Sequence, residues 1–490
     1  MHRLVAEHVR KMQPAERAGA VHDRAVGLIE DLTRFYEQTW RHDPAVRVLF
    51  EPMRLWIEFL LANTKTDRRL ALSAGVIAAA DATTGLLSRA IGLAEQVHTA
   101  LRALSEANPD DAQAQRDLST VLNDLGDFWL RWGQAGDAER ALACYEEDLG
   151  IARRLAADNP GSAEAARDLS VSLNKLGDFW LRRGQAGDAE RALACYEESL
   201  GTRRRLAADN PGSAQAARDL SVSLNKLGDF WLRRGQAGDA ERALGVYEEC
   251  AATMRRLAAD NPGSAEAARD LSVSLNKLGD FWLRRGQAGD AERALACYEE
   301  SLGTRRRLAA DNPGSAQAAR DLSVSLAKLG DFWLGRGQAG DAERALACYE
   351  ESLGTGRRLA ADNPGSAQAA RDLSVSLDRL GDFWLGRGQA GDAERALACY
   401  EESLGTRRRL AADNPGSAQA ARDLSVSLVR MGQVRGQAGD HQAAVAALAE
   451  AFAILDGFAT GGRPMDQQMI AVHRQLRAMF AGGGGPAGGG

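Results

Sequence analysis

Residues 168–218 read DLSVSLNKLGDFWLRRGQAGDAERALACYEESLGTRRRLAADNPGSAQAAR, and this unit returns along most of the chain. The aspartate that opens the unit recurs every 51 residues. The positions are Asp117, Asp168, Asp219, Asp270, Asp321, Asp372 and Asp423. A fixed period of this length is typical of a stacked array of repeats and not of a single globular core.

Apolar residues in the first half of the unit follow a helical pattern. They are Leu169, Leu173, Leu176 and Trp180, separated by four, three and four positions. This spacing places all of them on one face of a helix, whereas a strand would show alternation.

A second helical pattern follows the Gly184–Gly187 break. Asp188 is expected to cap this helix, which should end before Asn210-Pro211 because a residue before proline avoids helical dihedrals. Ser213 is then expected to cap the next first helix. Each unit is predicted to be a helix–turn–helix with two helices of about 20 residues, roughly 30 Å long.

The unit resembles the tetratricopeptide repeat. The resemblance rests on Leu176-Gly177, Trp180, Gly187-Asp188, Ala192-Leu193, Tyr196 and Leu200. The period is 51 residues and not the family's 34, so both helices are expected to be longer by about two turns. The resemblance implies an all-α fold, a right-handed α-solenoid whose concave groove binds a protein or peptide.

The repeat pattern predicts the domain organisation. We expect an N-terminal helical segment at 1–65, a divergent leading repeat at 66–116, six near-identical repeats at 117–422, a shortened repeat at 423–457, a capping helix at 458–480 and a flexible Gly-rich tail at 481–490. Atypical end units are usual in such arrays.

Outside the repeats, helical spacing predicts one long helix from Pro14 to Trp40. A second helix is expected to start near Pro44 and to be disturbed by Pro52. At the other end, residues 463–480 are expected to form the closing helix.

Residues 1–10, MHRLVAEHVR, resemble the end of the winged-helix segment of NB-ARC-type STAND ATPases, some of which continue into tetratricopeptide arrays. His2 would correspond to the family's nucleotide-contacting histidine, although Arg3 departs from its motif. An ordinary N-terminal helix explains the same residues. The chain contains no GxxxxGK[ST] phosphate loop.

Composition limits the functional classes. The apolar content of 45% is ordinary for a folded protein. The net charge of -6 argues against a nucleic-acid binder. No stretch of 18 uninterrupted apolar residues suggests a membrane span. A cytoplasmic protein is therefore expected, without a membrane or nucleic-acid partner.

Catalytic and metal sites are not expected. No histidine occurs between His98 and His441, so the complete repeats lack the commonest general base and metal ligand. The six cysteines recur about once per repeat with no CxxC spacing, which favours buried structural thiols. We expect no enzyme activity and no cofactor.

A polar stripe four residues apart recurs on the first helix of the unit and is the candidate partner-binding site. Its residues are Asn123, Asp127, Arg131, Asn174, Asp178, Arg182, Asn225, Asp229, Arg233, Asn276, Asp280 and Arg284. The stripe changes to Ala327, Asp331 and Gly335 in the fifth unit and to Asp378, Asp382 and Gly386 in the sixth. The alternative is that these residues are only the hydrated side of a helix, repeated by duplication.

Two other repeated features have structural explanations. The Arg203-Arg204-Arg205 run lies where cations favour a helix dipole, with no interleaved aromatic residue. Trp180 shares the leucine face and is expected in the core, whereas Phe179 is expected to contact the neighbouring unit.

The sequence thus predicts a scaffold that binds a protein or peptide in its groove. The alternative hypothesis is the sensor arm of a STAND-type switch, with an ATPase or effector partner supplied from outside this chain.

Overall fold

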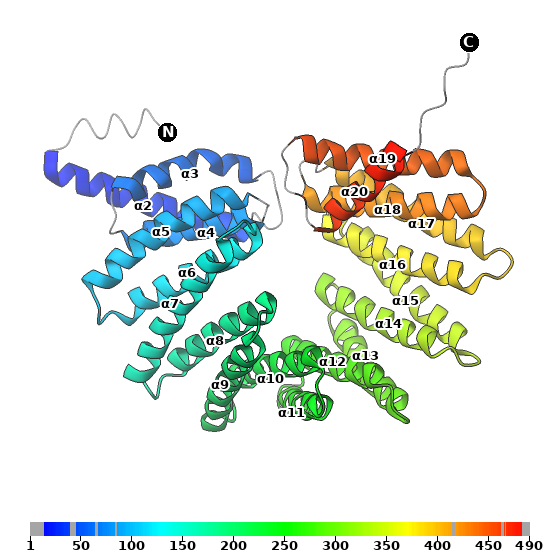
Figure 1. Cartoon of the computed structure of the whole chain (residues 1–490), viewed down its shortest axis with the longest axis horizontal. Coiled ribbons are helices and arrows are strands. Elements are labelled where there is room, and N and C mark those ends of the chain that lie inside the picture. Colours follow the sequence, from blue (N-terminus) through cyan, green and yellow to red (C-terminus); the bar gives the residue numbers. More distant parts are fainter. Residues whose placement is uncertain are drawn as a thin grey trace, which may run out of the picture. The chain divides into compact units, whose positions relative to one another are not determined.

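The computed structural model describes residues 14–39, 46–63, 67–83, 86–413, 417–461, 465 and 467–482. Every regular element in these ranges is an α-helix, as predicted (Figure 1). In chain order the helices are α2 (Pro14–Thr39), α3 (Val46–Asn63), α4 (Arg68–Thr83), α5 (Leu87–Ala107), α6 (Ala112–Trp132), α7 (Asp137–Asp158), α8 (Ala163–Arg183), α9 (Asp188–Asp209), α10 (Ala214–Arg234), α11 (Asp239–Asp260), α12 (Ala265–Arg285), α13 (Asp290–Asp311), α14 (Ala316–Arg336), α15 (Asp341–Asp362), α16 (Ala367–Arg387), α17 (Asp392–Asp413), α18 (Ala418–Gln437), α19 (His441–Thr460) and α20 (Gln467–Gly482).

The helices form pairs, α4/α5 to α18/α19, and the even-numbered member of each is here called the first helix. Within a compact unit, each second helix also packs on the first helix of the following pair. This is the tetratricopeptide-like arrangement of an all-α solenoid, in which each pair contacts only its neighbours.

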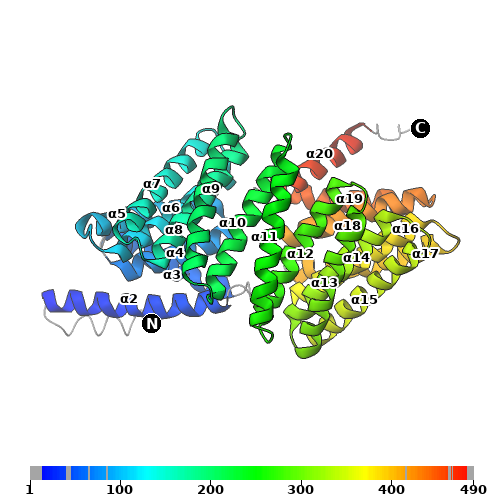
Figure 2. The same ribbon diagram turned by 90° about the horizontal axis from the view of Figure 1, so that it is seen from below.

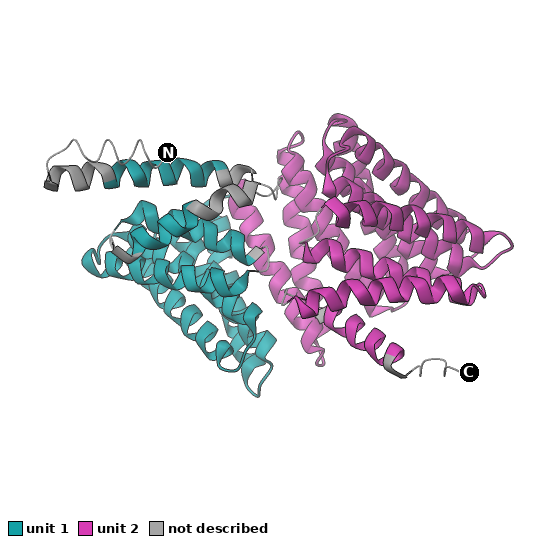
Figure 3. Cartoon of the chain, turned by 90° about the horizontal axis from the view of Figure 1, so that it is seen from above, with its two compact units in different colours: residues 1–211 teal, residues 212–490 magenta. Residues whose placement is uncertain are grey.

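The chain divides into two compact units, residues 1–211 and 212–490 (Figure 3). The first holds α2 to α9, and its core is built mainly from small and branched side chains of α3 to α6. The second holds α10 to α20, and Figure 2 shows its pairs from a second side.

The first helices begin as predicted. The Ser264 hydroxyl accepts a hydrogen bond from the Ala267 N–H at 3.1 Å, and Ser213 does the same for Ala216. These caps satisfy backbone donors that a helix start leaves free.

The turn inside the pairs α6/α7 to α14/α15 differs from prediction, because the aspartate that begins the second helix is not its cap. In the last pair, Asp440 does cap α19. Gly289 holds the capping position in the left-handed region with φ 80°, which leaves Asp290 as the first helical residue. The Asp290 carboxylate accepts from Arg285 at 2.6 and 2.8 Å and from the Gln287 N–H at 3.0 Å. The Arg285 guanidinium lowers the pKa of Asp290, so the turn is closed by a charge-assisted clamp.

Helix α3 begins two residues after Pro44, close to the expected start, and continues through position 52. At the C-terminus, α20 packs on α19 and buries Met469 and Leu476. The Gly-rich tail from 483 onward lies outside the described residues.

Among the described helices, α19 alone is long and apolar enough to pass a membrane-span test by length and composition. It is rich in alanine and packs on α18 as the second helix of the last pair.

Candidate ligand-binding pocket on the first helices

Each repeated pair holds a tyrosine of its second helix against a glycine of its first. A Cβ at Gly330 would lie 2.7 Å from Cε1 of Tyr349, so only glycine admits the ring. The Tyr349 hydroxyl donates to Asp331 at 2.7 Å. Burial and the Asp331 carboxylate raise the pKa of Tyr349, which keeps this hydroxyl a donor.

The same aspartate also accepts from the following first helix. Lys277 Nζ lies 2.8 Å from Asp229, Lys328 Nζ lies 2.6 Å from Asp280, and Arg379 donates to Asp331. The aspartate therefore joins two successive pairs.

The structure accordingly divides the predicted stripe by role. The aspartates Asp127, Asp178, Asp229 and Asp280 each accept from a tyrosine hydroxyl at 2.6–2.7 Å. The asparagines Asn123, Asn174, Asn225 and Asn276 are buried or half-buried, and their Oδ1 atoms are buried without a hydrogen bond in the described part of the chain. The arginines Arg131, Arg182, Arg233 and Arg284 are exposed, as is Asp229. Partner binding by this stripe stays a prediction.

The first repeat has Asp124 where the second has Lys175. Burial and the nearby Asp127 carboxylate raise the pKa of Asp124 to about 6. The folded state therefore favours protonated Asp124. The protonated Asp124 carboxyl contributes its full share of stability below about pH 4, the usual pKa of an aspartate in an unfolded chain. This contribution is lost as the pH rises through the pKa of the folded state.

We therefore expect Asp124→Asn to raise the midpoint of thermal unfolding at pH 8 and to leave it unchanged at pH 4. Calorimetry at both pH values measures the difference. The control is Asp110→Asn, the same substitution at an exposed position in the loop before α6. It should show no such pH dependence. An equal effect of Asp124→Asn at pH 4 and pH 8 would contradict the assignment.

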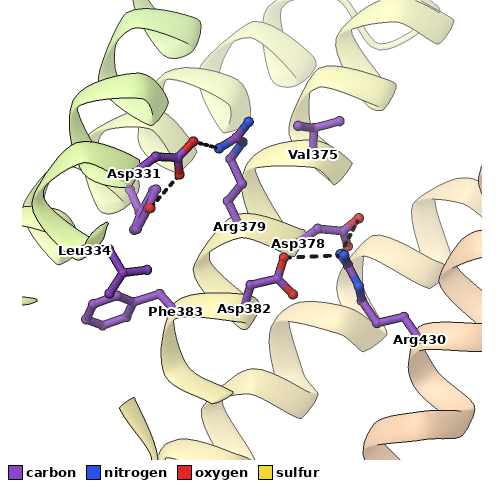
Figure 4. A pocket seen from close by; sticks show the side chains of 9 residues that line it. Asp331, Leu334, Val375, Asp378, Arg379, Asp382, Phe383 and Arg430 are labelled. Carbon is purple, nitrogen blue, oxygen red and sulfur yellow. Dashed lines mark hydrogen bonds and ion pairs between the residues drawn. The ribbon is translucent and has the colours of Figure 1, made fainter. Parts of the chain in front are cut away.

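The first helices of the second unit surround a pocket of ≈ 400 Å³. It is lined by Asp331, Leu334, Tyr349, Val375, Asp378, Arg379, Asp382, Phe383 and Arg430 (Figure 4). Except for Tyr349 on α15, these residues come from α14, α16 and α18. This volume lies in the range of ligand-binding pockets.

Carboxylates and guanidiniums alternate around the pocket (Figure 4). Asp378 is buried, accepts from Arg407 at 2.7 Å and lies 3.5 Å from Arg430. Asp382 lies 3.4 Å from Arg430, a looser pairing than the 2.6–2.8 Å of the earlier Lys–Asp pairs. The Asp382 carboxylate, with half of its side chain exposed, retains capacity to accept.

An apolar row leads to this pocket. Val222, Val273, Val324 and Val375 hold the same position on four successive first helices, and each is 44–52% exposed. Leu334, also lining the pocket, is 45% exposed. Exposed apolar side chains aligned in this way are typical of an interaction surface.

The sequence named Asp331, Asp378 and Asp382 as variants of the stripe but did not indicate the pocket that they line. The usable signal was departure from the repeat: Gly335 and Gly386 replace the stripe arginine, Asp378 replaces asparagine, and Arg379 replaces lysine. The solvent exposure of the valine row could not be told from the pattern of identical units.

The aromatic pair is structural, as expected. Trp282 is buried beneath Arg285 and Arg293, whose guanidinium carbons lie 4.5 and 4.7 Å from its ring centroid. Phe281 contacts Tyr247 of the preceding pair at a centroid distance of 6.0 Å.

The arginine run is not a continuous basic ridge in the second unit. Arg305 is buried and donates to Asp321, and Arg306 pairs with Glu351 of the next pair. The third member of this run, Arg307, is exposed.

Four of the six cysteines are buried, as expected of structural thiols, and Cys144 and Cys399 are half-buried. Cys195, Cys250, Cys297 and Cys348 are buried, and burial raises the pKa of each thiol to about 11. Within the described ranges no group of His, Cys, Asp and Glu is placed to hold a metal. His22 pairs with Asp67 at 3.0 Å, while His2, His8 and His42 lie outside these ranges, as does the whole STAND-like segment.

No known family model matches the chain. Protein NCA1 of Arabidopsis thaliana is 30% identical over 178 residues, 36% of this chain and 40% of that protein. The chain therefore spans about two fifths of the length of this curated relative.

Several solved structures are similar to the chain at low sequence identity. BtubC (BKLC) from P. vanneervenii is 22% identical over 57% of this chain and 94% of its own, with a TM-score of 0.41. The nuclear import adaptor Nro1 of S. pombe is 12% identical over 64% and 99%, with a TM-score of 0.36. A tetratricopeptide repeat protein from Parabacteroides merdae is 14% identical over 69% and 93%, with a TM-score of 0.32. The helical-repeat assignment rests on the helix pairs described above.

Proposed function

We propose that the chain is a scaffold that binds an extended peptide segment of a partner protein across the first helices of its second unit. The observation that carries this proposal is the pocket between α14, α16 and α18, together with the valine row that leads to it. The pocket supplies charged groups that fix orientation, and the row supplies apolar contact area.

The repeat favours an extended ligand. The valines recur on consecutive first helices, so one partner chain crossing these helices meets the same apolar position in each. Carboxylates and guanidiniums at the pocket then offer charge-assisted hydrogen bonds to the partner's side chains.

Adding large side chains beside the pocket tests the proposal, since Gly335 follows the lining residue Leu334 and Gly386 lies four residues after Asp382. In Gly335→Arg/Gly386→Arg, both glycines take the residue of the earlier repeats, and the new Cβ atoms meet nothing within 4 Å. Peptides selected from a random display library on the unmodified protein should bind this variant at least about tenfold more weakly, a loss of about 1.4 kcal/mol. Fluorescence anisotropy of the synthesised peptides gives the dissociation constants.

The matched control is Gly354→Arg/Gly405→Arg. These exposed glycines lie on the second helices α15 and α17, and their Cβ positions are equally open. The control adds the same two charges away from the pocket and should bind the peptides as the unmodified protein does. Equal binding by both double variants would place the interaction elsewhere.

A further inference from the structure

The first helices of the second unit differ in one exposed cation. Arg233 on α10 and Arg284 on α12 are exposed, whereas Gly335 on α14 and Gly386 on α16 stand at the same position. The arginine that follows this position is kept in all four helices. A cation in the last turn favours the helix dipole, but the kept arginine already supplies it. The change therefore concerns the surface and not the helix end.

The two exposed arginines are surplus cations of this surface. Neither forms a hydrogen bond or an ion pair in the described part of the chain. The neighbouring carboxylates already have partners, since Asp229 pairs with Lys277 at 2.8 Å and Asp280 with Lys328 at 2.6 Å. Both guanidiniums are therefore open to a ligand, and a guanidinium binds a carboxylate through two parallel hydrogen bonds.

Each exposed arginine lies on the same helix face as a valine of the row. Val273 and Arg284 are 11 positions apart, close to three full turns, so they lie about 16 Å apart along one face of α12. Lys277 and Asp280 lie between them on this face. The same spacing of valine and arginine holds on α10. The surface over α10 and α12 thus has an apolar side and a cationic side, separated by paired charges.

Over α14 and α16 both sides of this surface are apolar. Val324 and Val375 continue the row, while Leu334 and Leu385, which precede the two glycines, are 45% and 38% exposed. The charged groups between these apolar residues are paired. The surface of the second unit therefore changes along the stack, from one with surplus cations to one without.

We propose that the ligand peptide is acidic where it crosses α10 and α12 and apolar where it crosses α14 and α16. Its Asp or Glu side chains form charge-assisted hydrogen bonds with Arg233 and Arg284. An extended chain directs successive side chains to opposite sides, so one side of it faces the arginines while the other faces the valines. This inference rests on the proposed function, since it names the side chains that the peptide supplies.

Removing the two surplus charges tests the assignment. The probes are peptides selected from a random display library on the unmodified full chain, and they should be enriched in Asp and Glu. Arg233→Gln/Arg284→Gln should bind them at least about fivefold more weakly, as expected for the loss of two exposed ion pairs. Fluorescence anisotropy at low and high salt should also show a smaller salt dependence for this variant.

The matched control is Arg256→Gln/Arg307→Gln. These two exposed arginines lie on α11 and α13, the second helices of the same two pairs. The control removes the same charge from the same repeats and should bind the peptides as the unmodified protein does.

A charge exchange distinguishes recognition from a structural role. Arg233→Glu/Arg284→Glu should bind a peptide analogue in which lysine replaces each Asp and Glu more tightly than the unmodified protein does. Equal binding of the selected peptides by the two glutamine double variants would overturn this inference. If the same peptides still lose affinity for Gly335→Arg/Gly386→Arg, peptide binding by the scaffold stands and only the acidic assignment falls.

Discussion

Replacing Phe281 by alanine should lower the free energy of unfolding by about 3–5 kcal/mol, the usual cost of removing a buried phenylalanine. Phe281 is 1% exposed and contacts two aromatic rings, Trp282 in its own helix at 5.4 Å and Tyr247 of the preceding pair at 6.0 Å. The substitution therefore opens a cavity at the contact between pairs. In an array stabilised by nearest-neighbour contacts, this contact couples the unfolding of adjacent repeats.

Urea denaturation followed by circular dichroism measures the effect as a lower midpoint and a broader transition. Val273→Ala is the control, because Val273 lies on the same helix and is 45% exposed. It should cost about 1 kcal/mol or less. A Phe281→Ala variant that unfolds like the control would contradict the packing role of this ring.

A single added methyl group at Gly279 should also destabilise the protein, by about 1–3 kcal/mol. The Cβ that Gly279→Ala introduces would lie 2.8 Å from Cε1 of Tyr298. That ring cannot move aside at low cost, since it is 2% exposed and its hydroxyl is held by Asp280 at 2.7 Å. The two helices of the pair must therefore separate.

A second glycine-to-alanine substitution in the same pair is the control, and it is expected to stabilise the protein. Gly303 lies in α13 of the same pair, is exposed and has no atom within 4 Å of its Cβ position. Gly303→Ala should stabilise the helix by about 1 kcal/mol, the usual difference in helix propensity. Thermal unfolding of the two variants side by side gives the comparison, and stabilisation by Gly279→Ala would show that the ring does not need the glycine.

The helix pairs could be predicted from the sequence because their signals are local. The apolar spacing around Leu173 and Leu176, and a serine placed to cap each first helix, depend on residues within one or two turns. The 51-residue period then indicated that the pairs stack in an array.

The turn between paired helices was predicted only in part. Asp290 satisfies the rule for a cap, yet its carboxylate pairs with Arg285 five residues earlier, and Gly289 takes the capping position. Two local rules compete for one side chain here, and the geometry of the intervening loop decides between them.

The candidate site was harder to predict because its contacts are distant in sequence. Asp331 meets Tyr349 eighteen residues later and Arg379 in the next repeat. The sequence of the stripe does not show which repeat supplies these partners, because nearly the same residues recur in every repeat. Only the departures, Gly335 and Gly386 above all, point to where the surface differs.

The ion pairs between neighbouring repeats have a consequence for how such a chain can change its length. Arg255 pairs with Glu300, and Arg306 with Glu351, each 45 residues ahead, while Lys277 and Lys328 each reach back 48 residues to an aspartate. Equivalent ion pairs therefore form between each of these repeats and the next one. Deleting or duplicating one whole 51-residue unit brings together surfaces that already fit, so unequal recombination within the gene would yield longer or shorter arrays without creating a new interface.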